Sequence, residues 1–582
     1  MRNITYEGPS TPLSQELDAM KYRQKGESFD GKVKRISRSL CDSVEHQWIL
    51  EDIIGNMRFL PAGRVQSAMG ADKLVTAYNC FVSGEIKDSM DSIMDRAKEA
   101  AETMRRGGGI GYDFSKVRPK GTQIKSLDSQ ASGPISFMSI FDAVCQTISS
   151  SGHRRGAQMG VLRVDHPDIV EFIMAKRNSD KLTGFNISVG ITDKFMEALN
   201  KEDDSFNLIF DGIVYETVSA KKIWDQVMES TWDWAEPGVL FVDRIQEMNN
   251  LYYCEDISAT NPCGEQPLPP YGACLLGSFN LTQYLSGESD NYTFNFEQFK
   301  DDIPHVVRAQ DNVVDRTIYP LREQEDEAKN KRRMGLGVTG LANAGEMLGY
   351  EYGSKPFLRW MEKVFACLRD NTYFASAKLA EEKGAFPLYR EEYLKGNFIR
   401  TLPAFVQKEI RKHGIRNSHL TSIAPTGTIS LVADNISGGI EPVFSHSYQR
   451  TIQTFDGPRY EDVKDYAYAR GVEGRKADDI SVHEHLAVLT LAQHYVDSAC
   501  SKTCNVGDDV EYEEFKEVYE SAWREGCKGA TTFRMSGKRY GIFNETPTQT
   551  TEAQESDSQE AQSEEGAEAC FFDPQTGQRE CS

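Results

Sequence analysis

Residues 261–266 of the chain read Asn261-Pro262-Cys263-Gly264-Glu265-Gln266, and a second thiol follows at Cys274. Proline fixes its own backbone angle and lacks an N–H donor, and glycine permits a tight turn. A regular helix or strand would make no use of either Pro262 or Gly264. We therefore expect a loop that presents the side chains of Asn261, Cys263 and Glu265 to one place.

The carboxylate beside the first thiol limits the chemistry of this loop. Negative charge raises the pKa of a cysteine, so Glu265 makes Cys263 a poor thiolate nucleophile. The pattern favours a sulfur that carries a hydrogen atom, with the carboxylate accepting a proton from the substrate. Taken alone, the stretch fits a proline-rich loop with two buried cysteines equally well. A zinc pair is disfavoured, because no Cys-x-x-Cys or Cys/His partner set lies nearby.

At these residues the sequence resembles the ribonucleotide reductases, and most closely the adenosylcobalamin-dependent class II enzymes. Their catalytic loop reads Asn-Pro-Cys-Gly-Glu, and a Cys-x-Leu-Gly-Ser-x-Asn-Leu run follows it. This chain has Cys274-Leu275-Leu276-Gly277-Ser278-Phe279-Asn280-Leu281. The resemblance extends from about Phe59 to about Phe543. It implies an α/β fold, a ten-stranded α/β barrel with the catalytic cysteine on a finger loop, and an enzyme that reduces ribonucleotides to 2′-deoxyribonucleotides.

The resemblance also implies a role for each residue of the loop. Cys263 becomes a thiyl radical and abstracts the 3′ hydrogen of the ribose, Glu265 accepts the 3′ hydroxyl proton, and Asn261 positions the sugar hydroxyls. The reducing equivalents come from Cys274 and from Cys80, which lies in an apolar run typical of a buried strand. A lone cysteine in such a strand is usually a core residue, but its position in the family order favours a redox role.

Two groups of residues are expected to bind substrate. By the same resemblance, the backbone at Ala62, Asn79 and Gly109 approaches the nucleotide. A turn rich in hydroxyls, with one glycine and a helix after it, matches the substrate-phosphate loop of the family, and backbone N–H groups suit that role. An ordinary strand-to-helix turn with a threonine cap is the alternative. The residues of the turn are Pro425, Thr426, Gly427, Thr428, Ile429 and Ser430.

Effector binding is expected at three other segments. In the family, the residues that match Asp88-Ser89-Met90 and Arg118 form the allosteric site for dNTP or ATP. A loop that matches Arg154 and Arg155 links the effector to the substrate base. Taken alone, Asp88 and Ser89 need only cap a helix, and the two arginines need only form a solvated turn. The helices that bracket this region form the dimer interface in family members, which predicts a homodimer.

The source of the radical determines the class. Class I enzymes need a metal-containing partner and a tyrosine pair near the end of the large subunit, and residues 528–537 contain no such pair. We find no glycyl-radical motif of class III. Adenosylcobalamin is therefore the expected cofactor, with no directly ligated metal. A class I large subunit with an unusual relay, or a non-catalytic nucleotide-binding protein on the same fold, remains an alternative. The substrate is a diphosphate or a triphosphate, and dimeric relatives favour the diphosphate.

Composition sets the broad organisation. A net charge of −22 argues against a membrane or nucleic-acid surface, and 39% apolar residues support a substantial core. Twelve scattered cysteines without a secretion signal predict reduced thiols and a cytoplasmic enzyme. Residues 1–58 are expected to be helical and too short for the activity-controlling ATP cone of many reductases, and residues 59–543 to form the catalytic barrel.

The end of the chain has a different composition. Residues 544–582 are expected to be a disordered acidic tail, because Glu, Gln, Ser and Thr dominate most of it. Cys570 and Cys581 lie at its end, and a tethered dithiol can reach a buried disulfide by exchange. We expect a thioredoxin- or glutaredoxin-like protein to reduce them in turn. The sequence does not reveal whether the two cysteines pair directly.

Two pairs of residues have no role in the resemblance. His483 and His485 alternate on a predicted helix and are expected at the surface. Cys500 and Cys504 share a face if their segment is helical, and are expected to be packing residues.

Overall fold

The computed structural model describes residues 4–124, 128–150, 154–155, 157–177, 181–287, 291–454, 457–507, 510–534, 571–572 and 579–580. The α-helices of these residues are α1 (Pro12–Lys21), α2 (Phe29–Leu40), α3 (Val44–Gly55), α4 (Gly63–Ala68), α5 (Met90–Arg105), α6 (Pro134–Thr147), α7 (Ile169–Met174), α8 (Asp193–Leu199), α9 (Ala220–Trp234), α10 (Val242–Glu247), α11 (Phe296–Arg316), α12 (Arg322–Lys331), α13 (Leu341–Met347), α14 (Lys355–Lys383), α15 (Asn397–Arg400), α16 (Ala404–His413), α17 (Gly427–Val432), α18 (Val482–Tyr495) and α19 (Tyr512–Arg524). The strands are β1 (Phe59–Pro61), β2 (Cys80–Val82), β3 (Gly109–Asp113), β4 (Gln123–Ile124), β5 (Ser129–Gln130), β6 (Ser149–Ser150), β7 (Arg154–Arg155), β8 (Gln158–Arg163), β9 (Phe185–Ile191), β10 (Ser205–Phe210), β11 (Ile213–Ser219), β12 (Gly238–Phe241), β13 (Ala259–Thr260), β14 (Pro267–Leu268), β15 (Ala273–Cys274), β16 (Leu276–Asn280), β17 (Leu285–Ser286), β18 (Thr293–Phe294), β19 (Gly335–Thr339), β20 (Ser447–Thr454), β21 (Gly457–Lys464), β22 (Thr503–Val506), β23 (Gly529–Arg534), β24 (Phe571–Phe572) and β25 (Arg579–Glu580).

Two sheets form the centre of the molecule. An eight-stranded sheet has the order β15-β2-β3-β8-β9-β12-β23-β22, and a three-stranded sheet has the order β1-β16-β19. Strands β2, β3, β8, β9 and β12 run parallel to their neighbours in this series. Every residue of β9 is buried, as expected for a parallel strand that is covered on both faces. The chain is therefore a mixed α/β protein with about 46% helix, as the resemblance implies.

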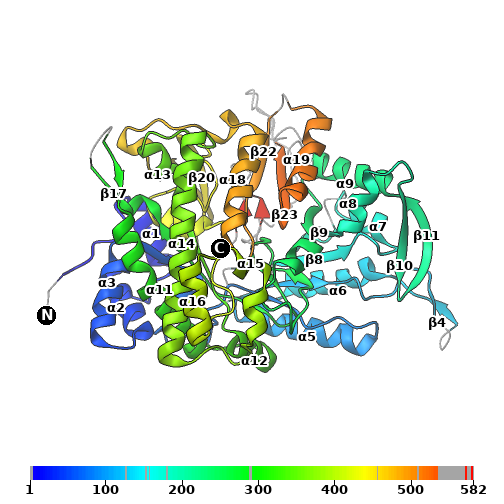
Figure 1. Cartoon of the computed structure of the whole chain (residues 1–582), viewed down its shortest axis with the longest axis horizontal. Helices are drawn as coiled ribbons and strands as arrows, with labels where there is room; N and C mark the ends of the chain where they lie inside the picture. Colours follow the sequence, from blue (N-terminus) through cyan, green and yellow to red (C-terminus); the bar gives the residue numbers. More distant parts are fainter. Residues whose placement is uncertain are drawn as a thin grey trace, which may run out of the picture.

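Helices cover these sheets from several directions. The long helix α14 packs against α11 and α16, and the three lie together in green at the left of Figure 1. Helices α2 and α3 pack against α11 and belong to the same apolar core as the strands that come after them in the chain. Ser28 and Ser43 cap the first turns of α2 and α3 with their side chains. The helices expected before residue 58 are therefore present.

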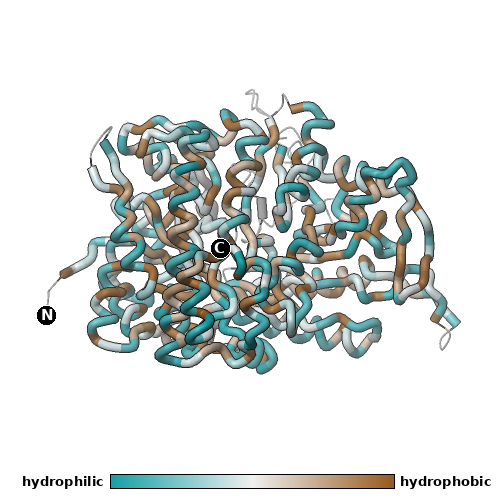
Figure 2. Tube along the Cα trace, viewed as in Figure 1, coloured by the Kyte–Doolittle hydropathy of each residue, from teal (hydrophilic) through white to brown (hydrophobic). Residues whose placement is uncertain are grey.

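A second apolar core lies on the other side of the eight-stranded sheet. It joins residues of α5, α6, α9 and α19 to those of β3, β8 and β9. Figure 2 shows many apolar segments inside the molecule and many polar segments along the outer helices. Among the described residues, no helix is both long enough and apolar enough to cross a lipid bilayer.

Candidate active site

The 261–266 segment is the tip of a hairpin between β13 and β14. The backbone N–H of Asn261 donates to the carbonyl of Gln266 at 3.1 Å, and that of Gly264 donates to the carbonyl of Asn261 at 3.0 Å. The Asn261 side chain accepts from the Gln266 N–H at 2.9 Å. Gly264 has a φ of +81°, which glycine adopts without strain. These bonds form the tight loop that Pro262 and Gly264 predict.

Contacts from three distant segments hold this loop in place. The side-chain amide of Asn186 donates to the carbonyl of Pro262 at 3.2 Å. The carbonyl of Glu265 accepts from the Ala499 N–H at 2.9 Å and from the Ser422 hydroxyl at 2.9 Å. Both ends of the loop are therefore fixed by hydrogen bonds in the interior. Asn261, Cys263 and Glu265 are all buried.

Glycines on β3 allow the loop to approach the sheet. A Cβ at Gly111 would lie 1.8 Å from the carbonyl oxygen of Thr260, so no side chain fits there. A Cβ at Gly109 would lie 3.2 Å from Pro262 Cγ and 3.4 Å from Cys80 Sγ. Gly109 is thus the point where β3, the finger loop and the Cys80 thiol meet. That the backbone of Gly109 approaches the nucleotide stays a prediction.

Cys80 and Cys274 face one another across two strands. They are partners in the antiparallel register of β2 and β15, both are buried, and both are thiols. Burial raises the pKa of Cys274 well above its ordinary value, and the neighbouring Cys80 and Glu265 raise it further. The Cys274 thiol therefore stays protonated at neutral pH. Cys263 is disulfide-bonded in this structure, so any chemistry of its thiol requires that bond to be reduced first.

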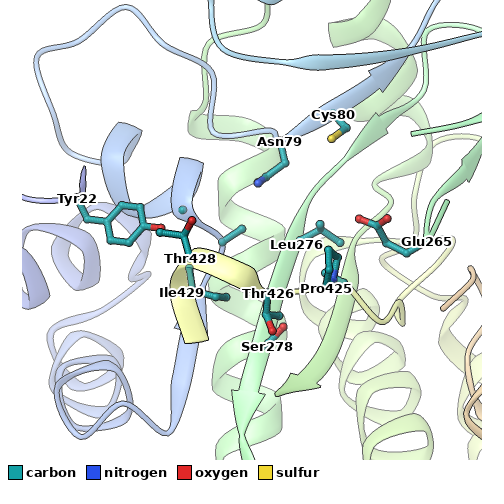
Figure 3. A pocket seen from close by; sticks show the side chains of 14 residues that line it. Tyr22, Asn79, Cys80, Glu265, Leu276, Ser278, Pro425, Thr426, Thr428 and Ile429 are labelled. Atoms are coloured by element: carbon teal, nitrogen blue, oxygen red, sulfur yellow. The ribbon is translucent and has the colours of Figure 1, made fainter. Parts of the chain in front are cut away.

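A pocket of about 530 Å³ adjoins these residues. Figure 3 shows Cys80, Asn79 and Glu265 at one end of it and Tyr22, Thr428 and Ile429 at the other. A second pocket, of about 430 Å³, is lined by Cys263, Gly264, residues 499–502 and residues 529–531, among others. Glu265 thus lines the first pocket and Cys263 the second. The two side chains do not line one pocket, which differs from the single place expected from the sequence, and the finger loop contributes to the walls of both.

The 425–430 turn closes the far end of the first pocket. Thr426 has a φ of +57°, and its hydroxyl lies 2.9 Å from that of Thr339 and 2.8 Å from that of Ser430. The same hydroxyl accepts from the Gly439 N–H at 2.7 Å. Ala62, Asn79, Pro425, Thr426, Thr428 and Ile429 line the first pocket. Gly427 and Ser430 instead line a third pocket of about 460 Å³ on the other side of α17.

The expected effector residues lie together in part. The Arg118 guanidinium pairs with the Asp88 carboxylate at 2.7 Å, and the Arg118 N–H donates to the same carboxylate at 3.1 Å. Ser89 caps α5, and Met90 begins that helix with 57% of its surface exposed. Arg154 and Arg155 form β7, which pairs with β6, but their side chains lie outside the described residues.

The tail is described only at β24 and β25, so Cys570 and Cys581 lie outside the described residues. β25 lies against α17, the helix that begins at the 425–430 turn. No group of three or more His, Cys, Asp or Glu side chains that could hold a metal ion occurs in the part of the chain that the structure describes.

Several residues of the pockets have no motif that identifies them. Tyr22 reaches the first pocket from the N-terminal segment, and Cys500 and Lys502 line the second.

His485 is fully buried and lies 3.0 Å from the Lys502 ammonium, so its expected surface position was wrong. The alternation of His483 and His485 on α18 places only one of them outside.

The two cysteines near β22 are packing residues, as expected. Cys504 lies on β22 inside the second apolar core, and Cys500 packs against both cores. Neither lies on a helix, because the segment that carries them is extended. Cys500 also lines the second pocket, which was not expected of a packing residue.

Comparison with known proteins identifies the family. The family described as "Ribonucleotide reductase, barrel domain" matches residues 78–533. The chain is similar to a vitamin B12-dependent ribonucleoside-diphosphate reductase of Thermoplasma acidophilum, at 34% identity over 87% of this chain and 67% of the relative. It is also 34% identical to a protein of the same name from Mycobacterium tuberculosis, over 84% of this chain and 72% of the relative.

A more distant relative extends the comparison. A vitamin B12-dependent ribonucleotide reductase of Rhodopirellula baltica is 26% identical over 85% of this chain and 55% of its own length. The family match covers the finger loop, the strands that carry Cys80 and Cys274, and the 425–430 turn. The chain belongs to the ribonucleotide reductase family.

Proposed function

We propose that this chain reduces ribonucleotides to 2′-deoxyribonucleotides and thereby supplies DNA precursors, with adenosylcobalamin as its cofactor. The observation that carries the proposal is the placement of Cys80 opposite Cys274 beside the pocket that Glu265 and the 425–429 turn also line. Two thiols in register can supply two electrons and end as a disulfide. The two similar reductases named as acting on ribonucleoside diphosphates favour that substrate.

The finger loop supplies the groups for the first half of the reaction. With its disulfide reduced, Cys263 loses a hydrogen atom, and the resulting thiyl radical takes the 3′ hydrogen from the ribose. The Glu265 carboxylate accepts the proton of the 3′ hydroxyl, and Asn261 positions the sugar hydroxyls. The side-chain nitrogen of Asn261 is buried and has no hydrogen-bond partner among the described residues, so a sugar hydroxyl would satisfy it.

The cysteine pair supplies the second half. The 2′ hydroxyl takes up a proton from one thiol and leaves as water, and the hydrogen of the other thiol goes to the 2′ carbon. The pair thereby delivers two electrons and ends as the Cys80–Cys274 disulfide, while Glu265 returns its proton to the 3′ oxygen. Cys263 then returns a hydrogen atom to the 3′ carbon. The high pKa of Cys274 supports this role, because a protonated thiol is needed as the acid. Opposed residues in antiparallel strands have Cα atoms roughly 4.5–5.5 Å apart. This spacing is compatible with a disulfide.

The tail is proposed to reduce that disulfide. Cys570 immediately precedes β24 and Cys581 immediately follows β25 in the sequence. The antiparallel pairing of Phe571 with Glu580 draws the ends of this segment together, which favours two thiols that act as a pair. The contact of β25 with α17 supports a tail that reaches the pocket. A thioredoxin- or glutaredoxin-like protein would then reduce the tail.

The second pocket suits part of the cofactor. We propose that the adenosyl end of the cofactor would enter it, because Cys263 lines this pocket. Ser501 and Thr531 bring hydroxyls to this pocket, and Lys502 a cation. When bound, adenosylcobalamin supplies the organic radical that removes the hydrogen atom from a thiol. The residues of this chain that would meet the adenosyl group are therefore Cys263, Ser501 and Thr531.

Regulation and assembly belong to the same proposal. A dNTP or ATP effector is proposed to bind beside Asp88, Ser89, Met90 and Arg118, and to reach the substrate through the loop that carries Arg154 and Arg155. A homodimer through α5 and α6 is supported by their mutual packing and by the exposure of Met90 and Met94. Light scattering of the purified protein at micromolar concentration tests the dimer, and a mass of one chain would contradict it.

The remaining organisation follows the family. We propose that the two sheets together form the ten-stranded barrel of residues 59–543, in which β15 and β16, separated by Leu275 alone, count as one strand. A helical segment over 1–58 precedes the barrel and a tail over 544–582 follows it. Single bridges from Thr421 to Leu336 and from Ile423 to Cys500 connect the β19 edge of one sheet to the β22 end of the other, which supports closure. The described cysteines that are free thiols, nine in number, support a reducing, cytoplasmic location.

One assay tests the proposal against its main rival. The purified protein is given a ribonucleoside diphosphate, a dithiol and adenosylcobalamin, with no second protein. We expect deoxyribonucleotide to form and to require the cofactor. If deoxyribonucleotide formed without adenosylcobalamin but only with a metal-containing partner protein, the chain would be a class I large subunit instead. Nucleotide binding without any product under either condition would identify a non-catalytic protein.

A further inference from the structure

The phosphate turn leads into α17, a helix of only six residues, and unusual backbone angles occur at both of its ends. Thr426 before the helix has a φ of +57°, and Asp434 and Asn435 shortly after it have φ values of +63° and +57°. Residues other than glycine seldom adopt this left-handed region, and a β-branched threonine does so least. Such angles persist where the surrounding contacts hold the backbone. The contacts around α17 therefore determine where the turn lies.

The Asp434 carboxylate joins the end of α17 to the N-terminal segment. It is buried, and it accepts from the Ser10 N–H at 2.8 Å, from the Ser10 hydroxyl at 2.8 Å and from the Thr11 N–H at 3.0 Å. Every hydrogen bond that it accepts from the described residues comes from these two. Helix α1 begins directly after them, so the positive end of its dipole lies beside the carboxylate. A buried carboxylate without such donors would be costly.

Two further contacts join α1 to α17 itself. The Ser14 hydroxyl donates to the carbonyl of Leu431 at 2.7 Å, in the interior. The same carbonyl accepts from the Asn435 N–H at 3.2 Å, so one oxygen connects α1, α17 and the residue that leaves α17. Leu17 of α1 and Ile429 of α17 belong to one apolar cluster, and Ile429 also lines the first pocket. The N-terminal segment therefore contacts α17 along its length.

These contacts reach the first pocket through α17. Six residues at about 1.5 Å each make this helix about 9 Å long, so a shift at its end becomes a shift of the phosphate turn at its start. Of the hydroxyls that line the pocket, those of Thr426 and Thr428 move with the turn, whereas that of Ser278 belongs to β16. Figure 3 shows Thr428 on the yellow α17, beside the blue N-terminal segment that carries Tyr22. A shift of α17 would therefore change the spacing between hydroxyls that face one nucleotide.

We propose that Asp434 is a positioning residue for nucleotide binding, and that it acts through residues 10–14. Docking of these residues on the end of α17 holds the phosphate turn in the position that binds a nucleotide most tightly. Bound nucleotide then strengthens the docking by the same factor, because the two equilibria are linked. The inference rests on the proposed function, since it takes the first pocket as the substrate site. The family match at residues 78–533 includes Asp434 but not its N-terminal partners.

The test uses three substitutions and a matched control, all in the full chain. Asp434→Ala removes the carboxylate, Asp434→Asn keeps one of its acceptor oxygens, and Ser14→Ala removes the hydrogen bond to α17. The control is Asp204→Ala. The Asp204 carboxylate also accepts from a serine hydroxyl and a backbone N–H at the start of a helix, those of Ser219 and Lys221 at α9. Asp204 lines none of the three pockets described above.

The first measurement separates binding from turnover. KM and kcat are determined for a nucleoside diphosphate, and its Kd is determined by calorimetry without cofactor. We expect Asp434→Ala to raise KM and Kd by about tenfold with kcat within about twofold, because a displaced turn weakens phosphate binding without touching the reacting carbon. Asp434→Asn and Ser14→Ala each keep part of the docking contacts and should raise both by about threefold. Asp204→Ala should change neither.

Hydrogen exchange measures the linkage without any turnover. The amides of Ser10 and Thr11 donate to Asp434, so a saturating nucleoside diphosphate should slow their exchange in the wild-type protein. The slowing should be about tenfold, to match the change of Kd in Asp434→Ala, because the coupling is reciprocal. In Asp434→Ala the diphosphate should no longer slow the exchange of these amides.

The opposite results have distinct meanings. If the wild-type protein reduces ribonucleotides and Asp434→Ala keeps the wild-type KM and Kd, the inference is overturned while the proposed function stands, even if this variant melts at a lower temperature. Wild-type exchange of the Ser10 and Thr11 amides that ignores bound diphosphate also overturns it. If the wild-type protein neither binds nor reduces a ribonucleotide, the proposed function fails, and the inference with it. Should Asp434→Ala fail to fold, Asp434→Asn and Ser14→Ala decide, because each removes only part of the docking contacts.

Discussion

Cys80 on β2 and Cys274 on β15 are cross-strand partners at one edge of the eight-stranded sheet. Both strands are short, and β15 is the edge strand, which pairs with β2 alone. β2 also pairs in parallel with β3 through Gly109, and β15 is separated from β16 of the second sheet by Leu275 alone. The thiol pair therefore lies where the two sheets join, and its spacing is set by backbone pairing rather than by side-chain choice.

This spacing predicts the fate of the two thiols during turnover. Without an external reductant, one deoxynucleotide should form per two thiols lost. Under multiple turnover, Cys80→Ser or Cys274→Ser should each lower the rate by at least about a hundredfold, since neither thiol can form the disulfide alone. Thiol titration and mass mapping before and after one turnover measure this. Cys367→Ser, at a cysteine on α14 that lines neither of the two pockets next to the finger loop, is the control. Wild-type turnover in either serine variant would contradict the assignment.

The phosphate turn depends on close backbone approach. A Cβ at Gly439 would lie 2.6 Å from the carbonyl oxygen of Ala424, and Gly439 has a φ of +49°. We expect Gly439→Ala to displace the turn and to raise KM for the nucleotide about tenfold or more. Gly471→Ala is the matched control, because Gly471 also has a positive φ, of +84°, but has no atom within 4 Å of a Cβ. Equal KM values in the two variants would show that the change in KM comes from backbone strain and not from the contact with Ala424.

A buried ion pair lies beside the second pocket, which Lys502 lines. The Glu441 carboxylate accepts from the Lys502 ammonium at 2.9 Å and from the Thr503 N–H at 2.6 Å. Burial lowers the pKa of Lys502, but Glu441 outweighs this and raises it. Glu441→Gln leaves a buried cation without its partner, which typically destabilises a protein by about 3–5 kcal/mol. Thermal or denaturant unfolding measures this loss.

The control for that prediction is an exposed pair. Lys116 and Glu85 lie 2.7 Å apart with side chains 59% and 41% exposed. Glu85→Gln should lower the free energy of unfolding by less than about 1 kcal/mol, because solvent screens such a pair. If both substitutions lowered the free energy of unfolding by the same small amount, the Glu441–Lys502 pair would not stabilise the fold as a buried pair is expected to.

Glu346 predicts a pH dependence of stability. Burial raises its pKa to about 8, and the nearby Asp465 carboxylate contributes to the increase. Because the pKa of Glu346 is raised in the folded state, the protonated carboxyl contributes fully to stability below about pH 4.5. This contribution is lost as the pH rises toward 8. Gln at position 346 cannot ionise. Between pH 5 and pH 8 the free energy of unfolding of Glu346→Gln should therefore rise by on the order of 3 kcal/mol relative to that of wild type. Parallel unfolding profiles over this range would contradict the prediction.

Much of the site can be predicted from short runs of sequence. The loop at 261–266 is predicted by Pro262 and Gly264, because these residues restrict the backbone locally. The pairing of Cys80 with Cys274 is predicted only by the family order, since strand register between segments so far apart has no local signal. The division of the finger loop between two pockets is visible only in the structure, because alternate side chains point to different sides.

Other residues had no local signal at all. Tyr22 reaches the first pocket because α1 packs on α17, a contact between segments about four hundred residues apart in the chain. Lys502 is buried because its partner Glu441, 61 residues earlier, neutralises it. His485 is inside because α18 is covered on most of its surface, which two alternating histidines cannot reveal. Tertiary packing determined each of these positions.

The central claim is that the sulfur of Cys263 starts the reaction as a one-electron carrier. The most direct test compares wild type with Cys263→Ser under the same conditions: a nucleoside diphosphate, a dithiol and adenosylcobalamin. We predict that wild type forms deoxynucleotide, and that Cys263→Ser forms none while it binds the diphosphate with an unchanged Kd. Deoxynucleotide formation by Cys263→Ser at the wild-type rate would contradict the claim.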